Sequence, residues 1–173
     1  MEGAGAEVSS VGWEGASASL FAEYDGVALS GSPDMMSEDS TLAKFSGEVE
    51  AVRDSHVPIL GVCFGHQMIA RAFGARVVKA PAHVLRFVKT DPVVHGGLFE
   101  GLPRHPMLLE SRYEMVESLP KGFAPLASSE TTPIAAMKHR SLPLYGLQSH
   151  PERFSKENPE GGALIRNFVE MLR

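Results

Sequence analysis

The sequence predicts an α/β fold in which parallel strands alternate with helices. Residues 26–30 and 57–63 are short apolar runs bounded by Gly or Pro, which is typical of buried strands. Residues 66–73 directly follow the second run and carry apolar side chains at helical spacing. Because strands that alternate with helices favour parallel pairing, we expect a mostly parallel sheet flanked by helices.

The remaining elements follow from the same patterns. Residues 40–55 carry an apolar helical face, and a closing helix is expected from about Pro159. Residues 142–147 read as a further strand that ends immediately before a polar segment. Shorter strand-like pieces are expected at residues 84–88, 107–109 and 134–137.

Length and composition indicate one soluble domain that spans residues 1–173. Hydrophobic residues make up 43% and charged residues 21% of the chain, which is ordinary for a globular protein. The net charge is −5 and no run of Lys and Arg is present, so nucleic-acid binding is not expected. No apolar run approaches the roughly 20 residues of a membrane span, and the N-terminus lacks the features of a secretory signal. A cytoplasmic location is therefore expected.

A single cysteine stands in a motif that is typical of a nucleophile elbow. Residues 61–65 read G-V-C-F-G, with Cys63 between a predicted strand and a predicted helix. Glycines at both ends permit a sharp turn that exposes the middle residue. The N-terminus of the following helix favours a thiolate, and the backbone N–H of Phe64 can donate to an oxyanion. One cysteine cannot form an internal disulfide or a thiolate metal cage, and a small buried apolar role for it stays open.

A cysteine nucleophile needs a base and a group that orients this base. His150 ends an apolar strand and is followed by Pro151 and Glu152, whose carboxylate can fold back onto the imidazole. An exposed His-Pro-Glu turn is the alternative. His66 lies next to the elbow and is expected to stiffen it. The other histidines are expected on the surface or in loops: His56, His83, His95, His105 and His139.

Three segments resemble the motifs of class I (triad-type) glutamine amidotransferases, in the family's order. Residues 58–67, P-I-L-G-V-C-F-G-H-Q, resemble the nucleophile motif. Residues 146–152, G-L-Q-S-H-P-E, resemble the signature usually written G-V-Q-F-H-P-E. Residues 24–33, Y-D-G-V-A-L-S-G-S-P, resemble the oxyanion strand. The resemblance covers nearly the whole chain and implies a flavodoxin-like or Rossmann-like fold.

The resemblance also implies roles for individual residues. Cys63 would attack the side-chain amide of L-glutamine, His150 would act as acid and then as base, and Glu152 would orient the imidazole. Gln67 matches the position that helps to hold glutamine. Two backbone N–H groups, those of Ser32 and Phe64, match the oxyanion donors. No cofactor or metal is implied, and the ammonia would pass to a synthetase or synthase partner. This partner should bind ATP, because the chain has no phosphate loop of its own.

Several branches of the family are similar. Residues 119–137 are most similar to the glutaminase part of GMP synthase, although Arg112 stands where that group usually has His. The glutaminase of anthranilate synthase and the γ-glutamyl peptidase-like proteins are alternatives, and so is a non-catalytic relic. Ser149 replaces the usual Phe. Residues 7–11 resemble the second strand of the family fold, so we expect the first β-α unit to be missing.

Overall fold

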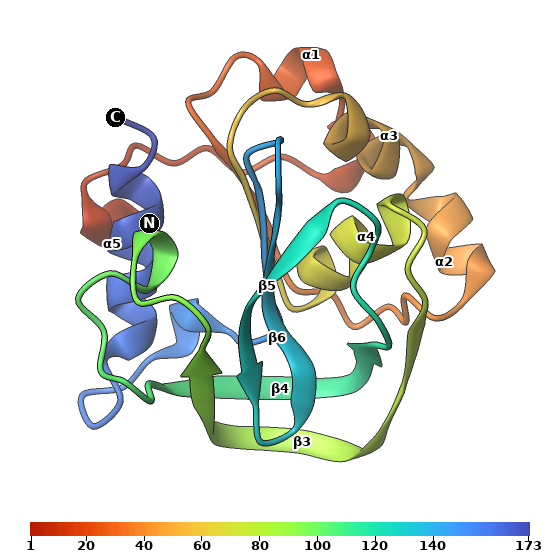
Figure 1. The fold of residues 1–173 in the computed structure, drawn as a ribbon. Helices are drawn as coiled ribbons and strands as arrows, with labels where there is room; N and C mark the ends of the chain where they lie inside the picture. Colours follow the sequence, from red (N-terminus) through yellow and green to blue (C-terminus); the bar gives the residue numbers. More distant parts are fainter.

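A computed structural model describes residues 1–173 and contains one seven-stranded sheet (Figure 1). The strand order across the sheet is β1-β2-β7-β6-β5-β3-β4. The strands are β1 (Val27–Leu29), β2 (Ile59–Val62), β3 (Val77–Pro92), β4 (Met107–Val116), β5 (Phe123–Ser129), β6 (Thr132–His139) and β7 (Leu144–Leu147). The α-helices are α1 (Ala18–Phe21), α2 (Asp39–Lys44), α3 (Ser46–Asp54), α4 (Phe64–Ala72) and α5 (Glu160–Glu170). Short 3₁₀ helices cover Glu2–Ala4, Trp13–Gly15, Gly97–Phe99 and Pro151–Arg153.

The α/β class is confirmed, but parallel pairing is confined to β1, β2 and β7. The other four strand pairings are antiparallel, which differs from the expected mostly parallel sheet. The reason is the connections. Parallel neighbours need a long crossover, whereas β5, β6 and β7 follow one another through short turns that only antiparallel strands can use.

Helices cover both faces of the parallel part of the sheet. In Figure 1, α2, α3 and α4 lie on one side of the strands and α5 lies on the other. Two separate apolar clusters fill these two layers. One contains Ile59, Met68 and Ile69, and the other contains Leu60, Leu147 and Phe168. Neighbouring residues Ile59 and Leu60 therefore point to opposite faces, which explains why this strand reads as a continuous apolar run.

Two details of the elements differ from the sequence prediction. The helix expected over residues 40–55 is broken at Phe45, which separates α2 from α3. Phe45 is buried and its ring packs 5.0 Å from the ring of Phe64 and 5.1 Å from that of Trp13. Strand β5 was not expected at all, because Pro125 and small residues weaken its strand pattern.

The expected strand at residues 7–11 is wrong. This segment forms no strand, and its apolar side chains Val8 and Val11 are exposed. Strand β1 pairs only with β2, so its other edge has no strand partner. A cleft of about 950 Å³ lies beside this edge, between the N-terminal segment and α5, and extends to Ser32.

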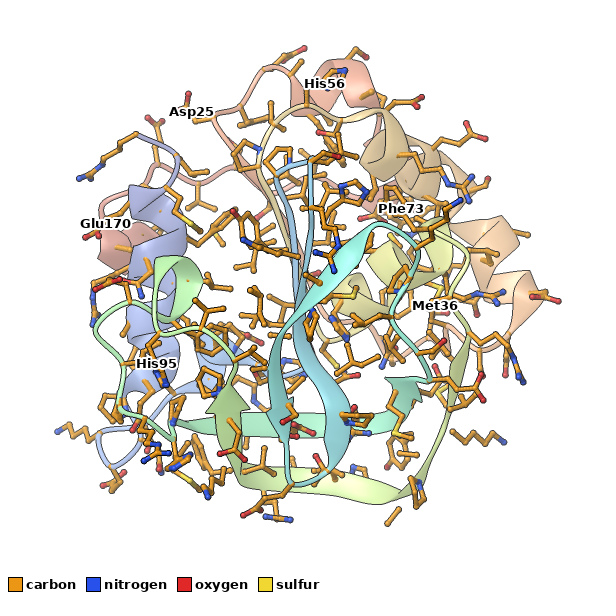
Figure 2. All side chains as sticks on the ribbon, in the orientation of Figure 1. Asp25, Met36, His56, Phe73, His95 and Glu170 are labelled. Atoms are coloured by element: carbon orange, nitrogen blue, oxygen red, sulfur yellow. The ribbon has the colours of Figure 1, made fainter.

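Peripheral side chains agree with the predicted pattern. Figure 2 shows Asp25, His56 and Glu170 at the edge of the molecule, and all three are exposed. Met36 is fully buried instead. None of the helices is long and apolar enough to cross a membrane.

Candidate active site

Cys63 has a strained backbone, as expected of a nucleophile elbow. Its φ of 52° makes it the one residue other than glycine with a positive φ in the described chain, residues 1–173. It stands between the end of β2 and the start of α4. Such strain in a non-glycine residue costs of order 1–3 kcal/mol and is concentrated at functional sites. The expected strand–turn–helix setting of Cys63 is therefore present.

The two glycines of the elbow are required by close backbone contacts. A Cβ on Gly61 would lie 2.5 Å from the carbonyl oxygen of Gly65. A Cβ on Gly65 would lie 2.5 Å from the carbonyl oxygen of Leu29 in β1. Side chains at either position would force the turn away from the sheet. The glycines thus let α4 start close to the ends of β1 and β2.

The sulfur of Cys63 lies between β4 and the end of β7. The thiol can donate to the carbonyl oxygen of Ser111, 3.6 Å from Sγ. The side-chain Nε2 of Gln148 lies 3.8 Å from Sγ on another side. Cys63 is largely buried and also faces the N-terminal N–H groups of α4. These surroundings favour negative charge on the sulfur.

The imidazole of His150 is held by Glu152, as the sequence predicts. Nδ1 of His150 lies 2.6 Å from Oε1 of Glu152. Burial opposes charge on the ring, but hydrogen bonds and charge interactions with Cys63 and Glu152 outweigh it and raise the pKa of His150 to about 10. A proton on His150 at neutral pH would complement a thiolate at Cys63.

The same strand positions His150 and Cys63. The backbone N–H of His150 donates to the carbonyl of Leu109 at 2.7 Å, two residues before Ser111 in β4. On the opposite side, Gly31 approaches the ring so closely that a Cβ there would lie 3.0 Å from Cε1 of His150. The expected elbow, His-Pro-Glu turn and oxyanion turn therefore lie together in space.

Two backbone N–H groups are placed where an oxyanion could bind. Phe64 is the first residue of α4, so its N–H lacks an acceptor within the helix. Ser32 makes no backbone hydrogen bond through its N–H. Its side-chain hydroxyl donates to Asp34 at 2.8 Å. The φ of Ser32 is not positive, so its replacement of the family glycine introduces no strain.

Gln67 is buried in the first turns of α4, and its amide N–H₂ group is already used. Nε2 donates to the carbonyl of Glu114 at 3.1 Å and to Oε1 of Gln148 at 3.3 Å. Its own Oε1 accepts no hydrogen bond from the chain and is the atom left for a substrate.

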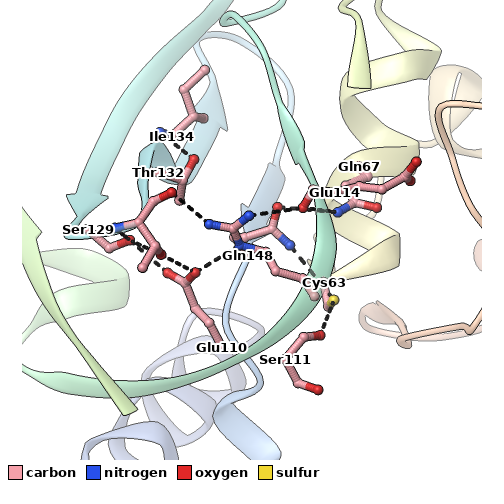
Figure 3. Close-up of polar contacts among 11 residues, drawn as sticks. Cys63, Gln67, Glu110, Ser111, Glu114, Ser129, Thr132, Ile134 and Gln148 are labelled. Carbon is pink, nitrogen blue, oxygen red and sulfur yellow. Dashed lines mark hydrogen bonds and ion pairs between the residues drawn. The ribbon is translucent and has the colours of Figure 1, made fainter. Parts of the chain in front are cut away.

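A buried polar cluster behind the elbow was missed by sequence reasoning. Figure 3 shows it between β4 and the β5–β6 hairpin. Glu110 accepts a hydrogen bond from Nε of Arg112 at 2.8 Å and another from Ser129 at 2.7 Å. Arg112 also donates to the carbonyls of Glu114 and Thr131. Glu110 and Arg112 are almost fully buried. The period-2 alternation of β4 was the one signal in the sequence that could have indicated them.

The remaining histidines take structural or peripheral places. His66 is fully buried, and this burial lowers its pKa to about 3. A Cβ on Gly146 would lie 2.5 Å from Nδ1 of His66, so the ring packs directly on β7. The five histidines predicted to be peripheral are half-buried or exposed. No group of three or more His, Cys, Asp or Glu lies together in a way that could hold a metal ion.

Comparison with known proteins agrees with this geometry. The family model of class-I glutamine amidotransferases matches residues 2–172. The chain is 40% identical to the glutamine-hydrolysing subunit of GMP synthase from Thermococcus kodakarensis, over 84% of this chain and 74% of that protein. It is 37% identical to the corresponding GMP synthase subunit from Pyrococcus abyssi, with the same coverage.

A solved structure gives the same answer for the fold. A protein from Thermoplasma acidophilum, described as a candidate subunit of GMP synthase, superposes with a TM-score of 0.79. It is 32% identical and the match covers 90% of this chain and 76% of that one. A glutamine amidotransferase from Thermotoga maritima shares the fold with a TM-score of 0.78 at 18% identity, over 87% of this chain and 79% of that one. The chain therefore belongs to the class-I glutamine amidotransferase family. The expected similarity to the GMP synthase branch is also confirmed.

Proposed function

We propose that this chain is the glutaminase subunit of a GMP synthase, with Cys63, His150 and Glu152 as its catalytic triad. The observation that carries the proposal is the strained φ of Cys63 beside an imidazole that is held at 2.6 Å by a carboxylate. The relatives named as glutamine-hydrolysing subunits of GMP synthase support the choice of acceptor.

The proposed reaction starts from a thiolate and an imidazolium. The thiolate of Cys63 attacks the γ-carbonyl carbon of glutamine, and the N–H groups of Phe64 and Ser32 donate to the oxyanion that forms. His150 gives its proton to the amide nitrogen as the carbon–nitrogen bond breaks. Ammonia leaves, and a γ-glutamyl thioester remains on Cys63.

Hydrolysis then restores the starting state. The neutral imidazole of His150 takes a proton from water, and the resulting hydroxide attacks the thioester carbonyl. The carbon–sulfur bond breaks, which releases glutamate and leaves thiolate and imidazolium again. The raised pKa of His150 supports this cycle, because the ring is protonated whenever the sulfur is charged. Glu152 holds Nδ1 throughout, so that the other ring nitrogen faces the reaction.

Two further parts of the proposal concern ligands. Gln67 would contact glutamine through Oε1, the acceptor that the chain leaves free. The ammonia would be used by an ATP-dependent synthetase subunit that amidates a nucleotide. A free-standing γ-glutamyl hydrolase is the second candidate, and it would release glutamate from glutathione faster than from glutamine.

Covalent labelling tests the site without a partner protein. The intact mass of the protein is measured after incubation with a diazo-ketone analogue of glutamine, with Cys63→Ala as the control. One adduct on the wild-type chain, absent from Cys63→Ala and blocked by excess glutamine, is the expected result. A folded wild-type protein that takes up no label would contradict the proposal. Stimulation of glutamine hydrolysis by a GMP synthetase subunit then tests the acceptor.

A further inference from the structure

Gln148 is a fully buried amide that directly contacts the sulfur of the elbow. It is the first residue after β7, and its backbone N–H donates to the carbonyl of Ala135 at 2.8 Å. This bond fixes the main chain of Gln148 next to Cys63. Its Nε2 lies 3.8 Å from Sγ, within the range of N–H···S contacts (Figure 3). Burial of an amide is costly unless its polar atoms have partners, so these contacts require an explanation.

The orientation of the amide follows from one backbone carbonyl. The carbonyl of Glu114 can only accept, so the group of Gln67 that faces it at 3.1 Å must be the N–H₂ group. The second hydrogen of that group points to Gln148 at 3.3 Å, which therefore presents its oxygen. The N–H₂ group of Gln148 is left to face Cys63. The assignment is thus determined by hydrogen bonding along this relay from Glu114 through Gln67 and Gln148 to the sulfur.

The relay also explains what the sulfur gains when it loses its proton. A thiol donates to the carbonyl of Ser111 at 3.6 Å, but a thiolate can only accept. Gln148 supplies a donor from within the protein, on a side different from the imidazole of His150. An N–H that donates to a charged group stabilises it more than it stabilises the neutral form.

We propose that Gln148 stabilises the thiolate of Cys63 by donating a side-chain N–H to Sγ, and that Gln67 holds Gln148 in the orientation that makes this possible. The inference rests on the proposed role of Cys63 as nucleophile. It gives Gln148 a direct contact with the reacting atom and gives Gln67 a positioning role besides its proposed contact with glutamine.

Other charged groups near the relay are identified so that their effects can be separated. His150, with Glu152 beyond it, faces the sulfur from the end of β7. Arg112 donates to the same carbonyl of Glu114 that fixes Gln67 and is paired with Glu110. Substitution of Gln148 leaves all of these ionisable groups in place, so a change at the sulfur can be assigned to the amide.

The test measures the alkylation rate of Cys63, the only cysteine of the chain, with iodoacetamide from pH 5 to 10. Gln148→Glu keeps an oxygen for Gln67 but places a carboxyl group against the sulfur. Gln148→Met keeps the approximate length and removes the donor. Both variants should alkylate about tenfold more slowly at pH 7, with the midpoint of the pH profile moved to higher pH. The control Ser149→Ala changes the neighbouring buried residue and should keep the wild-type profile.

Folding is checked by near-UV circular dichroism, and the pair of variants protects the test against one of them failing to fold. A wild-type profile in either folded variant would overturn the inference. The proposed function is tested separately by glutamine-blocked labelling of the wild-type chain. If that labelling succeeds while Gln148→Met and Gln148→Glu alkylate normally, only the role of Gln148 is lost. If the wild-type chain itself is not labelled, the nucleophile and this inference fail together.

Discussion

Nδ1 of His150 and Oε1 of Glu152 lie 2.6 Å apart, although only Pro151 separates the two residues in the chain. Pro151 begins a short 3₁₀ helix that turns the chain back on itself. The carboxylate is thereby brought under the ring without any help from a distant element. Glu152 is half-exposed, whereas the side chain of His150 is 13% exposed. Water can therefore reach the carboxylate side of the pair more easily than the imidazole.

This difference in exposure predicts unequal effects of substitution. His150→Asn should lower kcat for glutamine hydrolysis by about 10³-fold, because it removes the proposed acid and base. Glu152→Gln should lower it by about tenfold to 100-fold, because water can take over part of the contact with Nδ1. Steady-state ammonia release with the partner protein present measures both. An equal loss in the two variants would mean that Glu152 does more than orient the ring.

Burial of His66 predicts a loss of stability in acid. Its pKa is lowered to about 3 in the folded state, from 6.5 for an ordinary histidine. Above about pH 6.5 neither state binds the proton, so the full stability is present. Below that pH the unfolded chain binds a proton that the folded chain does not, and stability falls until the pH reaches about 3. Between pH 6.5 and 4.5 this histidine should cost on the order of 2–3 kcal/mol of unfolding free energy.

Urea unfolding at these two pH values measures the effect. His66→Gln cannot titrate and should show a smaller difference between pH 6.5 and 4.5 than the wild-type chain. The matched control His56→Gln removes an exposed histidine and should keep the wild-type difference. The readout is the pH dependence, so a general destabilisation by either substitution does not affect the comparison. Equal pH dependence in all three proteins would argue against a neutral, buried His66.

The sequence allowed the prediction of the elbow because each of its requirements is local. Gly61, Cys63 and Gly65 lie within five residues, and the close contacts of the glycines confirm the reason for them. The His-Pro-Glu turn is equally local. In contrast, the partners of Gln148 and Arg112 come from β4, α4 and the β5–β6 hairpin, far apart in the chain. No spacing rule predicts such contacts.

The sheet was predicted only in part for a related reason. The run at residues 57–63 is apolar throughout because helices cover both faces of β2, and this pattern is typical of parallel strands. Antiparallel pairing of β3 to β6 depends on short connections and on a bulge in β3 between Lys79 and Val84. Residues 7–11 carry a strand-like pattern, but no neighbouring strand pairs with them. Pairing partners, rather than local propensity, decided these segments.

Gly65→Ala should disrupt the elbow. The added methyl group would lie 2.5 Å from the backbone carbonyl of Leu29, which cannot move without shifting β1. Overpacking of this kind costs about 1–3 kcal/mol, and thermal unfolding measures it. Labelling of Cys63 by the glutamine analogue should slow in the same variant. Gly3→Ala is the matched control, because nothing lies within 4 Å of its added methyl, and it should change neither measurement.

The buried pair of Glu110 and Arg112 gives a prediction in which the double variant should be more stable than a single one. Both side chains are 1% exposed, and Nε of Arg112 lies 2.8 Å from Oε2 of Glu110. Arg112→Met would leave the carboxylate buried with only the hydroxyl groups of Ser129 and Thr131, which should cost about 3–5 kcal/mol. Glu110→Gln combined with Arg112→Met removes both charges, so it should recover part of that loss. Chemical denaturation of the two variants and the wild-type chain gives the three free energies. If the double variant unfolds as easily as Arg112→Met, the lost packing and backbone contacts of Arg112, rather than the unpaired charge of Glu110, cause the instability.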